Sequence, residues 1–126
     1  MGKKQIVYYA HCMKDYGSDM EKEHVKILER LGYYVLNPND PRIDSVVDQM
    51  QAEGKTSSEI MDYFLTIVKK CDVLAFATTT TGKVSAGVKK EIDYMKSLDR
   101  PVFQLPIYSN LETMSVDETR KFLKER

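Results

Sequence analysis

The sequence predicts an α/β fold: a doubly wound, mostly parallel sheet of four to five strands with helices on both faces. Short apolar, β-prone runs alternate with amphipathic helical patterns along the 126 residues. Such alternation favours parallel strands joined by right-handed crossovers, with helices on both sides of the sheet. No internal repeat, low-complexity tract or Gly/Ser linker divides the chain. We therefore expect one domain spanning residues 1–126.

The first third of the chain predicts a strand, a helix and a second strand. Gln5–Ala10 is apolar and β-prone, with the length of a buried strand. Ser18 and Glu21 then have the spacing of a capping box, in which each side chain satisfies a free backbone N–H of a new helix. That helix is expected to end at Gly32, before a short strand over Tyr33–Leu36.

The middle of the chain predicts two helices and a third strand. Asn37–Pro41 favours a break, because proline bars both helix and strand ladder and Asn and Asp favour turns. The next helix is therefore expected only over Ser45–Glu53. Thr56 opens a further helix with a second capping box. Asp72–Ala77 is almost continuously apolar, which indicates a strand buried on both faces.

The last third predicts a helix over Ser85–Ser97, a strand over Pro101–Leu105 and a terminal helix that begins after Ser115. In parallel sheets of this class, ligands bind at the carboxyl ends of the strands, near the point where the strand order reverses. This rule selects three loops for the functional site, namely residues 11–17, 37–42 and 78–85.

The composition excludes several classes of function. Lys and Arg number 19 and so do Asp and Glu, so the chain has no general attraction for nucleic acid polymers or anionic membranes. No run approaches the ~20 apolar residues of a membrane span, and no signal-peptide layout is present. Cys12 and Cys71 are too few for a disulfide framework, so we expect reduced thiols and a cytoplasmic protein. Without clustered Cys and His, no metal centre is expected.

Glu91 is unusual for its position in the predicted fold. It shares a helix face with Val88 and Met95, and this face should meet the sheet. A carboxylate there is costly unless it has partners or a function. One interpretation is a partly exposed glutamate paired with lysine, but its helical neighbours four residues away are Gly87 and Met95. The other is a functional carboxylate.

Other polar residues fall in the selected loops. Ser85 offers a hydroxyl and Gly87 close backbone approach at a helix start, where free N–H groups favour a phosphate or carboxylate. A capped helix with nothing bound is the alternative. Tyr8 and Tyr9 point to opposite sides of their strand, so one belongs to the core while the other can present its hydroxyl to a ligand. His11 can stack on or hydrogen-bond a base or sugar, although a surface histidine is the more common outcome.

The order and spacing of these segments resemble the nucleoside 2-deoxyribosyltransferase-like superfamily. The resemblance covers roughly residues 5–106. It rests on the opening strand Val7–Met13, the G-x-x-V-x-N-P pattern of Gly32–Pro38, and the segments Cys71–Leu74, Ser85–Glu91 and Arg100–Val102.

The resemblance implies a covalent chemistry that needs no cofactor or metal. In this superfamily, a glutamate at the position of Glu91 attacks C1′ of a (deoxy)nucleoside or its 5′-monophosphate and the base leaves. Water then completes hydrolysis, or a second base completes transfer, as in retaining glycosidases. The resemblance implies that Tyr8 orients this carboxylate, and that Ser85 and Gly87 hold the 5′-hydroxyl or 5′-phosphate.

The chain also departs from the family pattern. Members usually place an aspartate where this sequence has Phe64, so Asp62, two residues away, becomes the candidate catalytic carboxylate and Asp72 a candidate substrate-binding residue. His11 stands where many members have Gly and is a further substrate-binding candidate. Members often complete each site with a neighbour's C-terminal loop. That implies a homodimer or higher homo-oligomer, with Asn110 as the candidate here. The departures leave a non-catalytic nucleotide-binding module as the alternative to an enzyme.

Overall fold

Four parallel strands form one sheet in the part of the chain that the structure, a computed structural model, describes: residues 4–79, 82–106 and 115–124. The strand order β2-β1-β3-β4 confirms the predicted doubly wound α/β class. The strands are β1 (Ile6–Ala10), β2 (Tyr34–Leu36), β3 (Val73–Phe76) and β4 (Val102–Gln104). The helices are the 3-10 helix η1 (Met13–Asp15), α1 (Asp19–Arg30), α2 (Pro41–Ala52), α3 (Ser57–Lys69), α4 (Ala86–Ser97) and α5 (Val116–Lys124).

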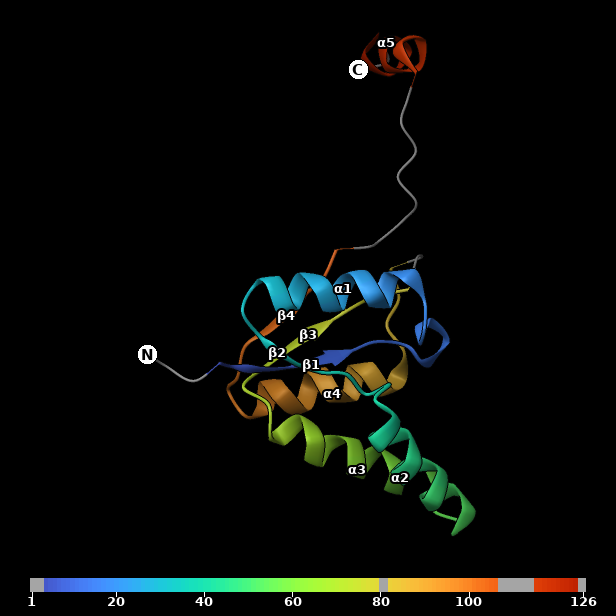
Figure 1. The fold of residues 1–126 in the computed structure, drawn as a ribbon, viewed down its shortest axis with the longest axis vertical. Helices are drawn as coiled ribbons and strands as arrows, with labels where there is room; N and C mark the ends of the chain where they lie inside the picture. Colours follow the sequence, from blue (N-terminus) through green and yellow to red (C-terminus); the bar gives the residue numbers. More distant parts are fainter. Residues whose placement is uncertain (1–3, 80–81, 107–114, 125–126) are drawn as a thin grey trace.

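The helices cover the two faces of the sheet, as predicted. Figure 1 shows α1 on one side of the strands and α3 and α4 on the other. Because successive strand residues point to opposite faces, Tyr8 packs in the apolar cluster formed with α3 and α4. Tyr9 packs in the cluster formed with α1, beside Leu28. The two adjacent tyrosines therefore belong to different cores, and both side chains are buried.

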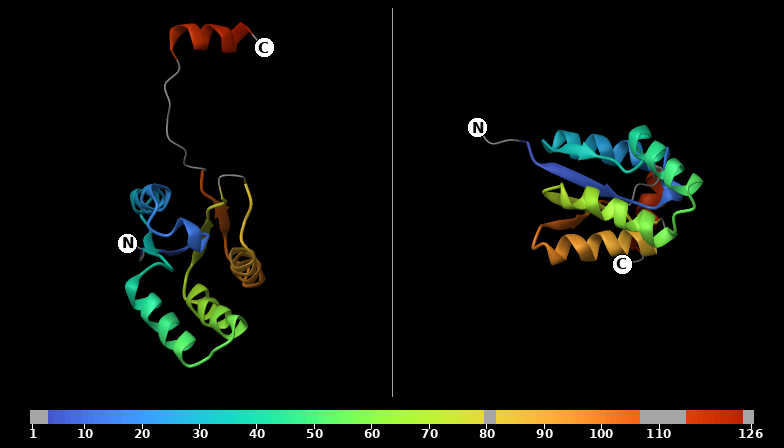
Figure 2. Two further views of the ribbon diagram at one scale, coloured as in Figure 1. Left: turned by 90° about the vertical axis from the view of Figure 1, so that its right-hand side faces the viewer. Right: turned by 90° about the horizontal axis from the view of Figure 1, so that it is seen from below.

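The strand order reverses between β1 and β3. The chain leaves β1 through α1 to reach β2 at one edge of the sheet, and it leaves β3 through α4 to reach β4 at the other edge. The two crossovers therefore depart from neighbouring strands in opposite directions. This switch point lies at the end of the sheet where the chain leaves β1 for η1 and leaves β3 for α4, and α2 lies on the same side of the sheet as α3 (Figure 2).

Helix α2 begins four residues earlier than the sequence pattern predicted, at Pro41 rather than Ser45. Asp40 caps it, because the Asp40 side chain accepts a hydrogen bond of 2.8 Å from the backbone N–H of Arg42. Proline is tolerated at the first helical position, where its missing N–H would lack a helical partner in any case. Pro41 therefore starts a helix here instead of breaking one, and Asp44 lies in its first turn.

Of the capping boxes predicted for α1 and α3, the structure completes only the one at α3. At the start of α3, Thr56 and Glu59 each satisfy the backbone N–H of the other, so this box is complete. At the start of α1, the Ser18 hydroxyl accepts a hydrogen bond from the Glu21 N–H. The Glu21 carboxylate turns away to His11 instead of closing the box. This half-formed box places a buried carboxylate beside the loop after β1.

The terminal helix α5 follows Ser115, as predicted, and the Ser115 hydroxyl caps it by accepting a hydrogen bond from the Glu118 N–H. Leu123 on this helix is exposed. None of the helices within the described ranges is long and apolar enough to cross a membrane.

Candidate active site

A cavity of about 530 Å³ lies at the switch point, where the chain leaves β1 and enters α4. Its volume falls in the range of roughly 300–1,000 Å³ that is typical of small-molecule sites. Its apolar side chains are Met13, Val47, Ile60, Met61, Phe64 and Val88. Its polar side chains are Tyr8, His11, Cys12, Lys14, Tyr16, Asp44, Gln51, Ser57, Ser85 and Glu91.

Tyr8 and Glu91 form a buried pair in the wall of this cavity. Tyr8 comes from β1 and Glu91 from the second turn of α4, which packs across β1. The Tyr8 hydroxyl donates a hydrogen bond to Glu91 Oε2. Tyr8 is fully buried and Glu91 is only 6% exposed. Glu91 is thus held by a neutral phenol inside the protein, and not at the surface by a lysine.

Burial changes the acidity of both partners. Loss of hydration raises the pKa of Glu91 from its ordinary 4.5 to about 7, against the opposing effect of the Tyr8 hydrogen bond. Burial, followed by the charge of Glu91, raises the pKa of Tyr8 well above its usual range. The phenol therefore keeps its proton as a donor. Glu91 changes charge near neutral pH, which is typical of functional carboxylates.

His11 lines the same cavity and is fixed on three sides. Its ring stacks on that of Tyr9, with centroids 3.9 Å apart. Its Nδ1 donates a hydrogen bond of 3.1 Å to the Tyr9 carbonyl oxygen, and its Nε2 is hydrogen-bonded to Glu21 Oε2 at 2.7 Å. Glu21 also accepts a hydrogen bond of 3.1 Å from the Gly17 N–H. These contacts fasten the two ends of the loop after β1 to each other and to α1.

Ser85 and Gly87 line the cavity at the positive end of α4. The Ser85 hydroxyl caps the helix by accepting a hydrogen bond of 3.3 Å from the Val88 N–H. A Cβ atom added at Gly87 would meet Met61 Sδ at 3.7 Å, an ordinary contact. Packing within the protein therefore does not require glycine at this position.

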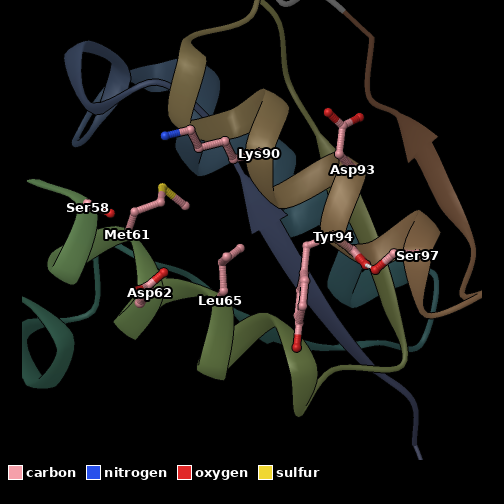
Figure 3. A pocket seen from close by; sticks show the side chains of 8 residues that line it. All are labelled: Ser58, Met61, Asp62, Leu65, Lys90, Asp93, Tyr94 and Ser97. Atoms are coloured by element: carbon pink, nitrogen blue, oxygen red, sulfur yellow. Dashed lines mark hydrogen bonds between the residues drawn. The ribbon is translucent and has the colours of Figure 1, made fainter.

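Asp62, predicted as a catalytic carboxylate, does not line this cavity. It belongs to a separate groove of about 370 Å³ between α3 and α4 (Figure 3). Lys90 and Tyr94 border the same groove from α4. A helix exposes different residues to its two sides, so a shift of two positions from Phe64 moves the carboxylate out of the cavity. The structure therefore does not bring Asp62 and Glu91 together.

Asp72 and Asn110 also fall outside the cavity's described lining. Asp72 precedes β3, at the end of the sheet opposite the switch point. Its Oδ2 accepts a hydrogen bond of 2.7 Å from the Ile6 N–H, so it joins the starts of β1 and β3. Asn110 lies outside the described residues. The structure thus brings together five of the eight predicted site residues: Tyr8, His11, Ser85, Gly87 and Glu91.

Among the cavity residues that were not predicted as site residues, Phe64, Tyr16 and Asp44 bear most on its chemistry. Phe64 lines the cavity at the position where members of the superfamily that the sequence resembles usually have an aspartate. Tyr16 packs against His11 with ring centroids 4.9 Å apart, and burial, then the charges of Glu91 and Asp44, raise its pKa. Asp44 enters from α2. The signal that could have located Asp44 is Asp40-Pro41, a cap followed by a first-turn proline.

The described residues contain no group of three or more His, Cys, Asp or Glu side chains arranged to hold a metal ion. The titratable groups lining the cavity come instead from β1, η1 and its flanks, α2 and α4.

No protein-family model matches the sequence, and comparison with curated proteins gives no match.

Proposed function

We propose that the protein cleaves the N-glycosidic bond of a (deoxy)nucleoside or its 5′-monophosphate through a covalent glycosyl–Glu91 intermediate. The sugar then passes to water or to a second base. The observation that carries this proposal is the hydrogen bond from Tyr8 to a buried Glu91 in the wall of the cavity. A desolvated carboxylate with one oxygen held in place suits nucleophilic attack on an oxocarbenium-like carbon.

The reaction divides into two displacement steps. Glu91 Oε1 attacks C1′ while Oε2 stays hydrogen-bonded to Tyr8, and the electron pair of the C1′–N bond leaves with the base, which takes a proton from solvent. A glycosyl ester on Glu91 results. In the second step an acceptor oxygen or nitrogen forms a bond to C1′, and the ester C–O bond breaks to regenerate the Glu91 carboxylate.

The rest of the cavity supports a nucleoside-sized substrate. Ile60, Met61 and Phe64 provide apolar surface for a base or the carbon face of a sugar. Ser85 and Gly87, at the start of α4, offer backbone and hydroxyl donors for a 5′-hydroxyl or 5′-phosphate. Lys14 adds an exposed cation to the same lining.

A non-catalytic nucleotide-binding module is the second candidate. Phe64 favours it, because an apolar ring replaces the carboxylate that the family pattern places there to assist the reaction. Glu91 would then accept a hydrogen bond from the bound ligand instead of attacking C1′.

Base release distinguishes the two candidates. The protein is incubated with a panel of ribo- and deoxynucleosides and their 5′-monophosphates, with and without an acceptor base, and free base is measured by liquid chromatography. The enzyme hypothesis predicts base release by the wild type and none by Glu91→Ala. Ligands that raise the melting temperature without releasing base would support the binding module and contradict the enzyme hypothesis.

We also propose a cytoplasmic homodimer or higher homo-oligomer. Cys12 and Cys71 are free thiols, as a reducing compartment requires. Met13, on the cavity lining, is 73% exposed and offers apolar surface to a neighbouring subunit. Light scattering of the purified chain tests the assembly, and a monomer at micromolar concentration would contradict it.

A further inference from the structure

The second reaction step needs a base if water is the acceptor, and the obvious candidates are not available. Both ring nitrogens of His11 are already hydrogen-bonded, to the Tyr9 carbonyl oxygen and to Glu21. Asp62 lines a different groove. Phe64 has no ionisable group, and it lies where the family pattern provides a carboxylate.

Asp44 supplies a carboxylate from another element. Among the described residues that line the cavity, Asp44 and Glu91 are the two with carboxylates. They approach it from different helices, Asp44 from the first turn of α2 and Glu91 from α4. Asp44 is exposed to solvent, whereas Glu91 is buried. The buried Glu91 therefore suits covalent attack, and the exposed Asp44 suits contact with an incoming water.

Resting on the proposed function, we propose that Asp44 is the general base that activates water against the glycosyl–Glu91 ester, which makes the protein a hydrolase. The phenol of Tyr16 lines the same cavity as both carboxylates, and the charges of Glu91 and Asp44 both raise its pKa. Its ring also packs against the fixed ring of His11. Tyr16 therefore shares the cavity lining with His11, Asp44 and Glu91.

The step balances without any further reactant. Water forms a bond to C1′ as one of its protons passes to the Asp44 carboxylate. The ester C1′–O bond breaks, and its electron pair returns to Glu91 as a carboxylate. Free sugar or sugar phosphate leaves, and the Asp44 proton passes to solvent. General-base assistance of this kind contributes roughly 10²–10⁴-fold to a rate.

The test compares Asp44→Asn with Asp48→Asn. Asp48 lies one turn further along α2, is exposed and does not line the cavity, so it controls for the change of charge on this helix. Without acceptor base, Asp44→Asn is expected to release about one equivalent of base per site and then turn over roughly 10²–10⁴-fold more slowly than the wild type. Intact mass should show the glycosyl adduct accumulating. Asp48→Asn should match the wild type.

Sodium azide provides the second measurement. Azide attacks C1′ without losing a proton, so it should restore turnover of Asp44→Asn and yield a glycosyl azide. Circular dichroism and melting temperature confirm that both variants fold, and Asp44→Ala repeats the test with a smaller side chain.

The failures of the two proposals are distinct. If the wild type releases base from no substrate, the proposed function itself is wrong. If the wild type releases base and Asp44→Asn does so at the same steady rate, only the role of Asp44 is overturned. The role of Asp44 is also overturned if Asp44→Asn releases no initial equivalent of base. It is overturned as well if the wild type releases base only when an acceptor base is present. Both results leave glycosidic cleavage intact.

Discussion

The Tyr8 hydroxyl donates a hydrogen bond to the Glu91 carboxylate, joining the first strand of the sheet to a helix 83 residues further along the chain. Each partner is costly to bury alone, since a buried carboxylate loses hydration and a buried phenol needs an acceptor. Together they satisfy each other, yet the pKa of Glu91 stays raised to about 7. The pair thus keeps a carboxylate with a raised pKa inside the fold.

Glu91→Gln should change how stability depends on pH. The folded-state pKa of Glu91 is about 7, above its ordinary 4.5, so the folded protein binds the extra proton between these values. Wild-type stability from this group is fully present below pH 4.5 and is lost as pH rises through 7. Glutamine does not titrate, so the variant should gain on the order of 3 kcal/mol relative to the wild type between pH 4 and pH 8. Urea unfolding at each pH measures the difference, and a constant difference would contradict the raised pKa.

Tyr8→Phe should shift the pH profile of base release to higher pH. The Tyr8 hydrogen bond lowers the pKa of Glu91, so its loss raises that pKa and reduces the carboxylate fraction at neutral pH. We expect kcat/KM at pH 7 to fall about ten- to a hundredfold, the equivalent of a hydrogen bond to a charged group.

Tyr9→Phe is the matched control for Tyr8→Phe. The Tyr9 hydroxyl is hydrogen-bonded to His24 Nδ1 at 2.8 Å on the other face of the sheet. Tyr9→Phe should lower the free energy of unfolding by about 1 kcal/mol without moving the pH profile of base release. An equal shift in both variants would show that Tyr8 acts only through the packing of β1.

Gly87→Ala should separate folding from substrate binding. The added methyl would meet Met61 Sδ at an ordinary 3.7 Å, and alanine favours helix over glycine, so the variant should be as stable as the wild type or about 0.5 kcal/mol more stable. The methyl would stand at the start of α4, where we place the 5′ group of the substrate. We expect a higher KM with an unchanged melting temperature. An unchanged KM would remove Gly87 from the proposed 5′ subsite.

His24 should make the protein less stable in mild acid. Burial lowers the pKa of His24 from its ordinary 6.5, while its hydrogen bond to the Pro106 carbonyl oxygen acts in the opposite direction. The unfolded chain therefore binds a proton more readily, and stability present above pH 6.5 is lost as pH falls from there. Unfolding of the wild type and His24→Gln between pH 7.5 and pH 5 isolates this contribution, because the opposite effect of Glu91 is common to both. A steeper acid loss in the variant would contradict it.

Local patterns were sufficient to predict the fold. The apolar run of β1, the continuous apolar character of β3 and the Thr56 cap of α3 each identify an element within a few residues. Glu91 was identifiable because a carboxylate on an otherwise apolar helix face needs an explanation. Each of these features is defined by residues that lie close together in the sequence.

The partners of the site depend on long-range geometry that local patterns do not contain. The sequence pattern around Pro41 predicted a break, whereas the cap from Asp40 makes Pro41 the start of a helix. Asp44 therefore fell outside the predicted helix and was not identified as a site residue. Glu21 had the spacing of a capping box but bonds to His11, because burial of the imidazole favours a charged partner over a helix end. Asp62 is close to Phe64 in sequence but faces another groove.

The proposed covalent intermediate on Glu91 can be detected by intact-mass analysis. The wild type and Glu91→Gln are each mixed with the best substrate from the base-release panel, quenched in acid within milliseconds to seconds, and weighed by mass spectrometry. A wild-type mass increase equal to the glycosyl group, mapped to the peptide that contains Glu91 and missing in Glu91→Gln, is the predicted result. Base release by the wild type with no adduct at any time, or an adduct that persists in Glu91→Gln, would contradict it.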